Sequence, residues 1–158
     1  MSHRDLILYE EDQRRLTENL RSLCAGAKSR AVFLIDKNGR LLAQAGEADA
    51  VDTTTLASLT AGIVAATSGL AQLLGEREFN ALVHEGAQES LHVSLVAGEA
   101  ILVVLFDRHS LGLVRLRVKK AAEEIARTFA TIGTQGDRAA GDEMGQITDE
   151  DIENLFSA

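Results

Sequence analysis

The sequence predicts an α/β chain of the α+β sandwich type, in which helices flank a five-stranded, mainly antiparallel sheet. Two observations predict this class. Five short segments are rich in apolar residues and are separated by turn-forming residues, which is typical of hairpin-linked strands. Three longer segments repeat apolar residues at helical spacing, and one of them, residues 53–75, contains no charged residue. The expected element order is α-β-β-α-β-β-β-α.

The N-terminal part of the chain predicts a helix followed by a hairpin. The helix is expected over residues 10–27, because three acidic residues occupy its start, where the helix dipole favours negative charge. Its apolar residues form a narrow stripe: Leu16, Leu20, Leu23 and Ala27. The run AVFLI at 31–35 is typical of a strand covered on both faces. Asn38-Gly39 then predicts a tight turn into a second strand over residues 40–45.

The uncharged segment 53–75 predicts a central helix with two apolar stripes. Asp52 or Thr53 can cap its start, and Gly75 suits its end. One stripe is large: Leu56, Leu59, Ile63, Ala66, Leu70 and Leu73. The other stripe is small: Ala57, Ala61, Ala65 and Gly69. Because neither stripe offers charge to water, we expect the helix to be covered on one side by its own sheet and on the other by a second protein.

Two other interpretations of this helix compete. Its length would suit a membrane span, but threonine, serine, glutamine and glycine are scattered through it, and the flanking segments are typical of a soluble domain. We therefore expect no membrane span. The helix could also be buried entirely within one copy of the chain, and the sequence leaves this alternative open.

The C-terminal half predicts three strands and a long helix. Strands are expected over residues 79–85, 90–96 and 100–106, and the last of these (AILVVLF) is the most apolar and should be central. In the second strand His92 and Ser94 alternate with apolar residues and so lie on the opposite face. Helical spacing of apolar residues then extends over residues 110–132.

We divide the chain into residues 1–132, an α+β domain; 133–146, a flexible linker without apolar periodicity; and 147–158, a short C-terminal interaction helix. In the last segment Thr148 and Asp151 resemble a capping box. Its apolar residues share one face: Ile152, Leu155 and Phe156. This face either packs on the chain's own domain or binds a partner.

Charge is distributed unevenly along the 158 residues, which carry a formal net charge of −8. Residues 133–158 hold seven acids and one arginine, a net charge of −6, whereas the preceding residues hold 17 acids and 15 bases, a net charge of −2. This distribution argues against nucleic acid as a partner, since phosphate binding needs a clustered basic surface. The single cysteine, Cys24, is interpreted as a core thiol, and no secretory leader is visible, so a cytoplasmic location is expected.

The chemistry of an enzyme is missing from the sequence. Neither a phosphate-binding G-x-x-x-x-G-K-[ST] pattern nor paired metal-ligand spacing is present, and no catalytic set can be named, so we expect no catalytic residue, no metal and no cofactor. The four histidines are interpreted as surface residues: His3, His84, His92 and His109. One basic cluster remains: Arg108, Arg115, Arg117, Lys119 and Lys120. An ion-pair ladder with Glu123 and Glu124 explains much of it, and contact with an acidic partner surface or phosphate is the alternative.

An ordered set of motifs resembles the bacterial MglB family of Roadblock/LC7 domain proteins. In chain order the motifs are LYEED, VFLIDKNGRLL, DTTTLASLTAGIVAAT, LAQLLGEREF, HEGAQESL, LVVLFD, SLGLVRLRVKKA and ITDEDIENLF. They cover almost the whole chain outside residues 133–146. No single motif is decisive, but their order is specific to this family.

The resemblance implies a homodimeric GTPase-activating protein for an MglA-type, small Ras-like GTPase that acts in cell polarity and gliding motility, with the protein in the cytoplasm and at a cell pole. GTP and magnesium would be bound by the partner GTPase alone. Central helices would pair in the dimer through Ala57, Ala61 and Val64. The GTP-bound GTPase would dock on a neighbouring surface of the same helix: Ala61, Ala65, Ser68, Gly69 and Gln72. The face of Ile152, Leu155 and Phe156 would bind the GTPase away from its nucleotide.

Two other functions stay open at this stage. The chain could be a Roadblock scaffold that tethers a GTPase or motor without changing its rate. A small-ligand sensor is a weaker alternative, because the strands supply few polar groups for a pocket.

Overall fold

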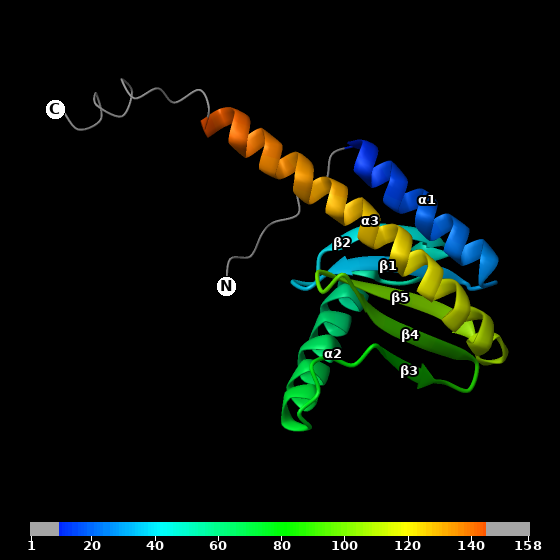
Figure 1. The fold of residues 1–158 in the computed structure, drawn as a ribbon. Helices are drawn as coiled ribbons and strands as arrows, with labels where there is room; N and C mark the ends of the chain where they lie inside the picture. The colour runs from blue at the N-terminus through cyan, green and yellow to red at the C-terminus, as the bar shows by residue number, and fades with distance from the viewer. Residues whose placement is uncertain (1–9, 145–158) are drawn as a thin grey trace, which may run out of the picture.

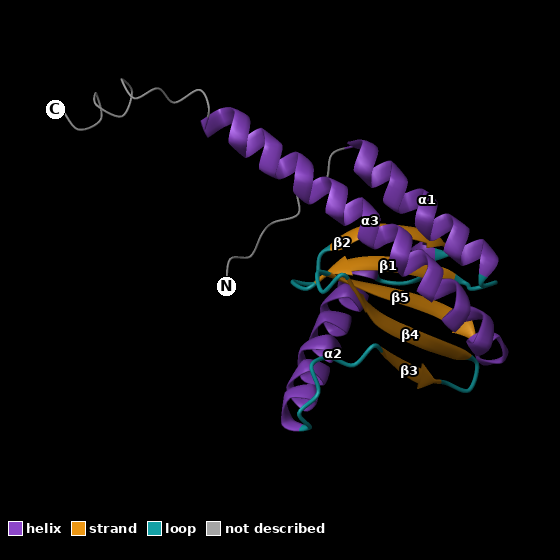
Figure 2. Cartoon of the chain, in the orientation of Figure 1, coloured by secondary structure: helices purple, strands orange, loops and turns teal. Residues whose placement is uncertain are grey.

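The structure, a computed structural model, describes residues 10–144, and the side chains of residues 10–132. Three helices flank one sheet (Figures 1 and 2). The helices are α1 (Glu10–Gly26), α2 (Thr53–Leu73) and α3 (Leu111–Met144). The strands are β1 (Ala31–Asp36), β2 (Leu41–Gly46), β3 (Ala81–Glu85), β4 (Glu89–Val96) and β5 (Ala100–Asp107). Two short 3-10 turns precede α2 and α3: η1 (Ala48–Ala50) and η2 (Arg108–Ser110).

The five strands form one sheet in the order β2-β1-β5-β4-β3, and every neighbouring pair is antiparallel. Strand β5 lies at the centre, between β1 and β4, as the apolar run AILVVLF predicts. The five-stranded antiparallel sheet and the element order are therefore confirmed. Strands β2 and β3 form the two edges.

Both faces of the sheet are covered by helices, so each central strand is buried on both sides. Helices α1 and α3 lie side by side on one face, and α2 lies on the other (Figure 1). On the first face Leu34, Leu102 and Phe106 pack with Leu20 and other helix residues. On the second face the core consists mainly of strand residues: Phe33, Ile35, Val93, Ile101 and Val103. Alternation along β1 and β5 thus feeds two separate apolar clusters.

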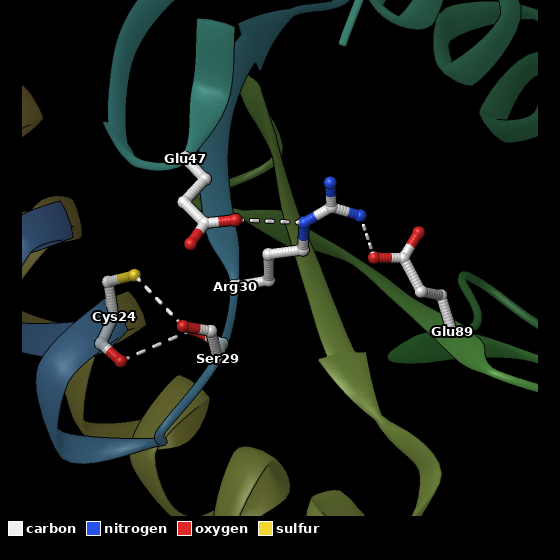
Figure 3. A network of polar contacts seen from close by, with 5 residues as sticks. All are labelled: Cys24, Ser29, Arg30, Glu47 and Glu89. Carbon is white, nitrogen blue, oxygen red and sulfur yellow. Dashed lines mark hydrogen bonds and ion pairs between the residues drawn. The ribbon is translucent and has the colours of Figure 1, made fainter. Parts of the chain in front are cut away.

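Arg30 joins the ends of three strands just before β1. Its Nε donates to a carboxylate oxygen of Glu47 at 3.1 Å, and its guanidinium also pairs with Glu89 at the start of β4 (Figure 3). These carboxylates, Glu89 first, raise the pKa of Arg30 above its ordinary value. Beside this network the Cys24 thiol donates to the carbonyl of Ser29 at 3.4 Å. Cys24 is half-buried against the core, so the expected core thiol lies at its margin.

The structure corrects two expectations. His92 is only 3% exposed, because α3 covers the face of β4 on which it lies, so its interpretation as a surface histidine is wrong. Its Nδ1 has no hydrogen-bond partner within the described part of the chain, and burial lowers its pKa, with the nearby Arg115 charge as a second cause. In addition, α3 runs to Met144, so the linker expected over residues 133–146 is helical as far as residue 144.

The longer helix has a simple physical origin. Once the preceding turns of α3 are formed and packed, each further residue adds a backbone hydrogen bond without a new nucleation cost. The chain contains no proline that would stop this propagation, and alanines 139 and 140 favour it. Three glycines in 133–144 weaken the helix but do not end it.

Candidate protein-interaction surface

Helix α2 has well-defined ends. At its start the Asp52 carboxylate accepts hydrogen bonds from the backbone N–H of Thr55 at 3.2 Å and from its hydroxyl at 2.7 Å. These bonds lower the pKa of Asp52, and they confirm the predicted cap. At its end Gly75 has φ of +75°, and Glu76 N–H donates to the carbonyl of Ala71 at 2.8 Å, the pattern of a Schellman motif.

One side of α2 packs closely on its own sheet. Ala57, Thr60 and Ala71 are buried, and Leu56, Ala61 and Val64 are half-buried against the sheet. The close approach is visible at the β1–β2 turn, where a Cβ on Gly39 would lie 3.4 Å from the Cα of Ser58. Small side chains permit this approach. The first half of the small stripe therefore faces the chain's own sheet.

The other side of α2 is apolar and open to solvent. The exposed fractions of its leucines are 65% for Leu59, 55% for Leu70 and 80% for Leu73, and Leu74 beyond its end is 67% exposed. Gly62, Ala66 and Gly69 lie among them in sequence and are also exposed. A Cβ on Gly62 or Gly69 would meet no atom within 4 Å. We name this side, from Leu59 to Leu74, the α2 outer face.

The two stripes therefore have different roles from those expected. Three leucines of the large stripe form the α2 outer face, and Ala57 of the small stripe is 1% exposed against the sheet. Ala57 is consequently not available for a dimer interface, which corrects that assignment. The alternative of a helix buried within one copy is also wrong, because most of α2 is exposed.

The other predicted contact residues are distributed over two sides of the helix. Ala65, Ser68, Gly69 and Gln72 are exposed, whereas Ala61 and Val64 are half-buried. Sequence reasoning missed Leu74. It placed Leu59, Leu70 and Leu73 on one face of the helix but did not decide whether that face lies on the sheet or in solvent. The C-terminal residues Ile152, Leu155 and Phe156 lie outside the described residues.

One helix covers the second face of the sheet incompletely. Beside α2 a shallow groove opens toward β3 and β4, lined by Ile63, Val64, Thr67, Leu82, Val93 and Leu95. Leu82 and Leu95 are only half-buried there. The α2 outer face, this groove and the edge strand β3 thus form one side of the molecule on which apolar groups lack full cover. Such a side is typical of a protein interface.

The described residues also contain no candidate metal site. Among the described residues no group of three His, Cys, Asp or Glu could hold a metal ion. By length and composition α2 would suit a membrane helix, and only 17% of its most apolar window is buried. A helix that a partner protein covers can have the same length and composition, and α2 packs on its own sheet through Ala57 and Thr60.

Comparison with known proteins identifies this fold. Residues 16–106 match the Roadblock/LC7 domain. The chain belongs to the Roadblock/LC7 family. Comparison of the Roadblock/LC7 chain with curated proteins gives no match.

Solved structures place the Roadblock/LC7 chain among MglB proteins. Myxococcus xanthus MglB is 48% identical, with a TM-score of 0.76 and coverage of 80% of this chain and 96% of that chain. The gliding protein MglB from Thermus thermophilus is 36% identical, with a TM-score of 0.75 and coverage of 82% and 99%. A structure described as MglB with a tetrameric arrangement is 36% identical, with a TM-score of 0.76 and coverage of 83% and 99%. The expected resemblance to MglB is confirmed.

Proposed function

We propose that this chain is a homodimeric activator of a small Ras-like GTPase of the MglA type, acting in cell polarity and gliding motility. The observation that carries the proposal is the uncharged α2 outer face in a chain 48% identical to Myxococcus xanthus MglB. Each exposed leucine buried by a partner contributes about 1.5–3 kcal/mol. Several adjacent leucines therefore favour a stable protein complex rather than a free surface.

The chain supplies a docking surface, and the chemistry resides in the partner. Phosphoryl transfer by a GTPase needs an oriented water and stabilised charge on the transferred group. We propose that binding at the second half of the α2 outer face, around Ala65, Ser68, Gly69 and Gln72, reshapes the switch region of the GTPase, so that its own residues perform both tasks. The chain itself is then a regulator rather than an enzyme.

The proposal is tested by measuring GTP hydrolysis of the cognate MglA-type GTPase with and without the chain. The hydrolysis rate should rise with chain concentration and saturate, and the chain alone should hydrolyse no GTP. Gly69→Arg should abolish the stimulation, because the added side chain points into open space where the partner would dock. Gly112→Arg is the matched control, since Gly112 is exposed on α3 and a Cβ added there would also meet no atom within 4 Å.

Arg77 separates two mechanisms of activation. It is exposed in the loop that follows α2, a place from which an arginine could enter the partner's phosphate site. An arginine that acts in this way contributes about 10³–10⁵-fold to the rate. If the GTPase is reshaped instead, Arg77→Ala should change the maximal rate by less than about three-fold. A loss of more than 100-fold would overturn the reshaping mechanism.

The alternative function is a scaffold that binds the GTPase without changing its rate. Binding of the GTP-loaded partner at unchanged hydrolysis would select it. In both cases we propose the C-terminal residues Ile152, Leu155 and Phe156 as a second contact. They follow α3 in the chain, and the last turns of α3 extend away from the sheet (Figure 1).

A further inference from the structure

The layer formed by α1 and α3 carries a basic surface at one end. The two helices lie side by side, and a Cβ on Gly26 near the end of α1 would be 3.4 Å from the Cδ of Arg117 on α3. Residues 19–28 and 111–122, which meet at this end, contain six bases and no acid: Arg21, Lys28, Arg115, Arg117, Lys119 and Lys120. We name these six residues the basic end.

None of the six bases of the basic end forms an ion pair with another described residue. All six side chains are exposed. The ion pairs among the described residues are Arg15–Glu11, Arg30–Glu47 and Arg30–Glu89. The expected ladder from Lys119 and Lys120 to Glu123 and Glu124 is therefore not formed. Between the helices, Asn19 and Ser22 add neutral polar groups to a groove that Arg117 and Lys120 also line, with Glu124 at its side. The surface suits a ligand with several negative charges.

The chain itself contains a segment of the opposite charge. Residues 142–153 hold six acids and no base: Asp142, Glu143, Asp149, Glu150, Asp151 and Glu153. Four of the six fall within residues 149–153, beyond the end of α3 at Met144. We propose that the acidic segment 149–153 of one copy binds the basic end of a second copy.

Chain length favours a contact between two different copies. Lys120 lies 24 residues before Met144, which is about 36 Å along a helix. Glu153 follows Met144 by nine residues, which span at most about 32 Å when fully extended. The other acids of the segment are nearer to Met144, and Arg115 and Arg117 are farther away. With α3 intact, the fully extended backbone of the segment ends about 4 Å short of its own Lys120, and only extended side chains would close that gap, whereas the segment of another copy meets no such limit.

This contact goes beyond the proposed function, because it requires no GTPase. Exposed ion pairs are individually weak, but several between two complementary segments act together, and all of them are screened by salt. We therefore expect a weak, salt-sensitive association of copies that occupies the acidic segment when no other partner is present.

Zero-length carbodiimide crosslinking of the full-length chain tests the proposal. A mixture of ¹⁴N- and ¹⁵N-labelled protein is treated, and crosslinked peptides are identified by mass spectrometry. The reagent joins a lysine amine to a carboxylate only when they are in direct contact. The expected product joins Lys119 or Lys120 to residues 149–153 with one light and one heavy peptide. Lys37, exposed in the β1–β2 turn, reports nonspecific reaction.

Paired variants make the test specific. Arg115→Gln with Arg117→Gln keeps the reactive lysines but removes two charges, and should lower the yield about five-fold. Arg14→Gln with Arg15→Gln makes the same change at the other end of α1, and should lower it less than about two-fold. The product should also vanish at about 1 M NaCl, where the screening length is about 3 Å.

Several outcomes would overturn the proposal. Products made only of two light or two heavy peptides would show that the segment folds back within one copy. Products that persist in about 1 M NaCl would show a contact that is not electrostatic. The crosslinked product could also be absent while the chain binds phosphatidylglycerol vesicles. If the changes at Arg115 and Arg117 then abolish vesicle binding, the basic end would be assigned to an anionic lipid surface instead.

Discussion

Gly46 and Arg30 lie so close together that no side chain fits between them. A Cβ on Gly46 would stand 2.4 Å from the carbonyl oxygen of Arg30 and 2.8 Å from the Cys24 sulfur. The φ angle of Gly46 is +78°, a region that residues with a Cβ rarely adopt. This approach lets Glu47 N–H donate to the Arg30 carbonyl at 2.9 Å and brings the Glu47 carboxylate to the guanidinium (Figure 3).

Gly46→Ala should therefore destabilise the fold strongly. The positive φ angle costs about 1–2 kcal/mol for a residue with a Cβ, and displacing the Arg30 carbonyl adds about 1–3 kcal/mol. Urea unfolding followed by circular dichroism measures the loss. Gly98→Ala is the control, because Gly98 has φ of +67° but a Cβ there would meet no atom within 4 Å, so only about 1–2 kcal/mol should be lost. Equal losses in the two variants would contradict the steric argument.

The sequence was sufficient to predict the sheet, because its signals are local or nearly so. The runs AVFLI and AILVVLF are short, apolar at consecutive positions and rich in β-branched and aromatic residues, which is typical of a strand with both faces covered. The turn at Asn38-Gly39 and the cap at Asp52 each depend on neighbouring residues alone. These features are present in the structure.

Orientation of α2 could not be predicted from periodicity. The leucine stripe and the small stripe are both apolar, so helical spacing does not decide which one faces the sheet. A tertiary contact decides it, since Gly39 can approach Ser58 and Ala57 only where side chains are small. For His92, alternation assigned the correct face of β4, but the cover provided by α3 depends on packing between distant segments.

Burial of His92 predicts a loss of stability at acid pH. Burial, and next the Arg115 charge, hold its pKa below 6.5, the ordinary value for histidine. Between the folded and unfolded pKa values the unfolded chain binds more protons, so the free energy of unfolding falls as the pH drops below 6.5. The slope from one proton cannot exceed about 1.4 kcal/mol per pH unit. Urea unfolding at a series of pH values from neutral to mildly acid measures it.

His92→Leu should remove this component of the pH dependence. Leucine has no proton to gain at acid pH. At neutral pH it replaces an imidazole whose Nδ1 has no hydrogen-bond partner among the described residues. The free energy of unfolding at neutral pH should therefore change by less than about 1.5 kcal/mol. His84→Leu, at an exposed position of β3, is the control and should leave the slope in place. An unchanged slope in the His92 variant would assign the acid sensitivity to other groups.

Two equally exposed leucines test whether the start of the α2 outer face, at Leu59, pairs in the homodimer, beside the part around Gly69 on which the GTPase is proposed to dock. Leu59 on α2 is 65% exposed and Leu116 on α3 is 66% exposed. In a two-fold dimer each change occurs twice, so Leu59→Lys should weaken association by about 3–6 kcal/mol and yield monomers at micromolar concentration. Leu116→Lys should leave the dimer intact. Analytical ultracentrifugation measures both, and identical dimer affinities would remove Leu59 from the interface.

The last prediction concerns the apolar face near the C-terminus and depends on the proposed function. The triple change Ile152→Ala, Leu155→Ala and Phe156→Ala removes the predicted apolar face. Burial of this face favours binding, but the entropy cost of ordering the segment offsets much of that free energy. The net effect should be about a ten-fold weaker affinity for the GTPase, or about 1.4 kcal/mol, measured by calorimetry. The maximal hydrolysis rate at saturation should be unchanged, because docking on α2 is untouched. Asn154→Ala, in the same segment but outside the predicted apolar face, should alter neither quantity. A fall in maximal rate with unchanged affinity would instead give this segment a role in the hydrolysis step itself.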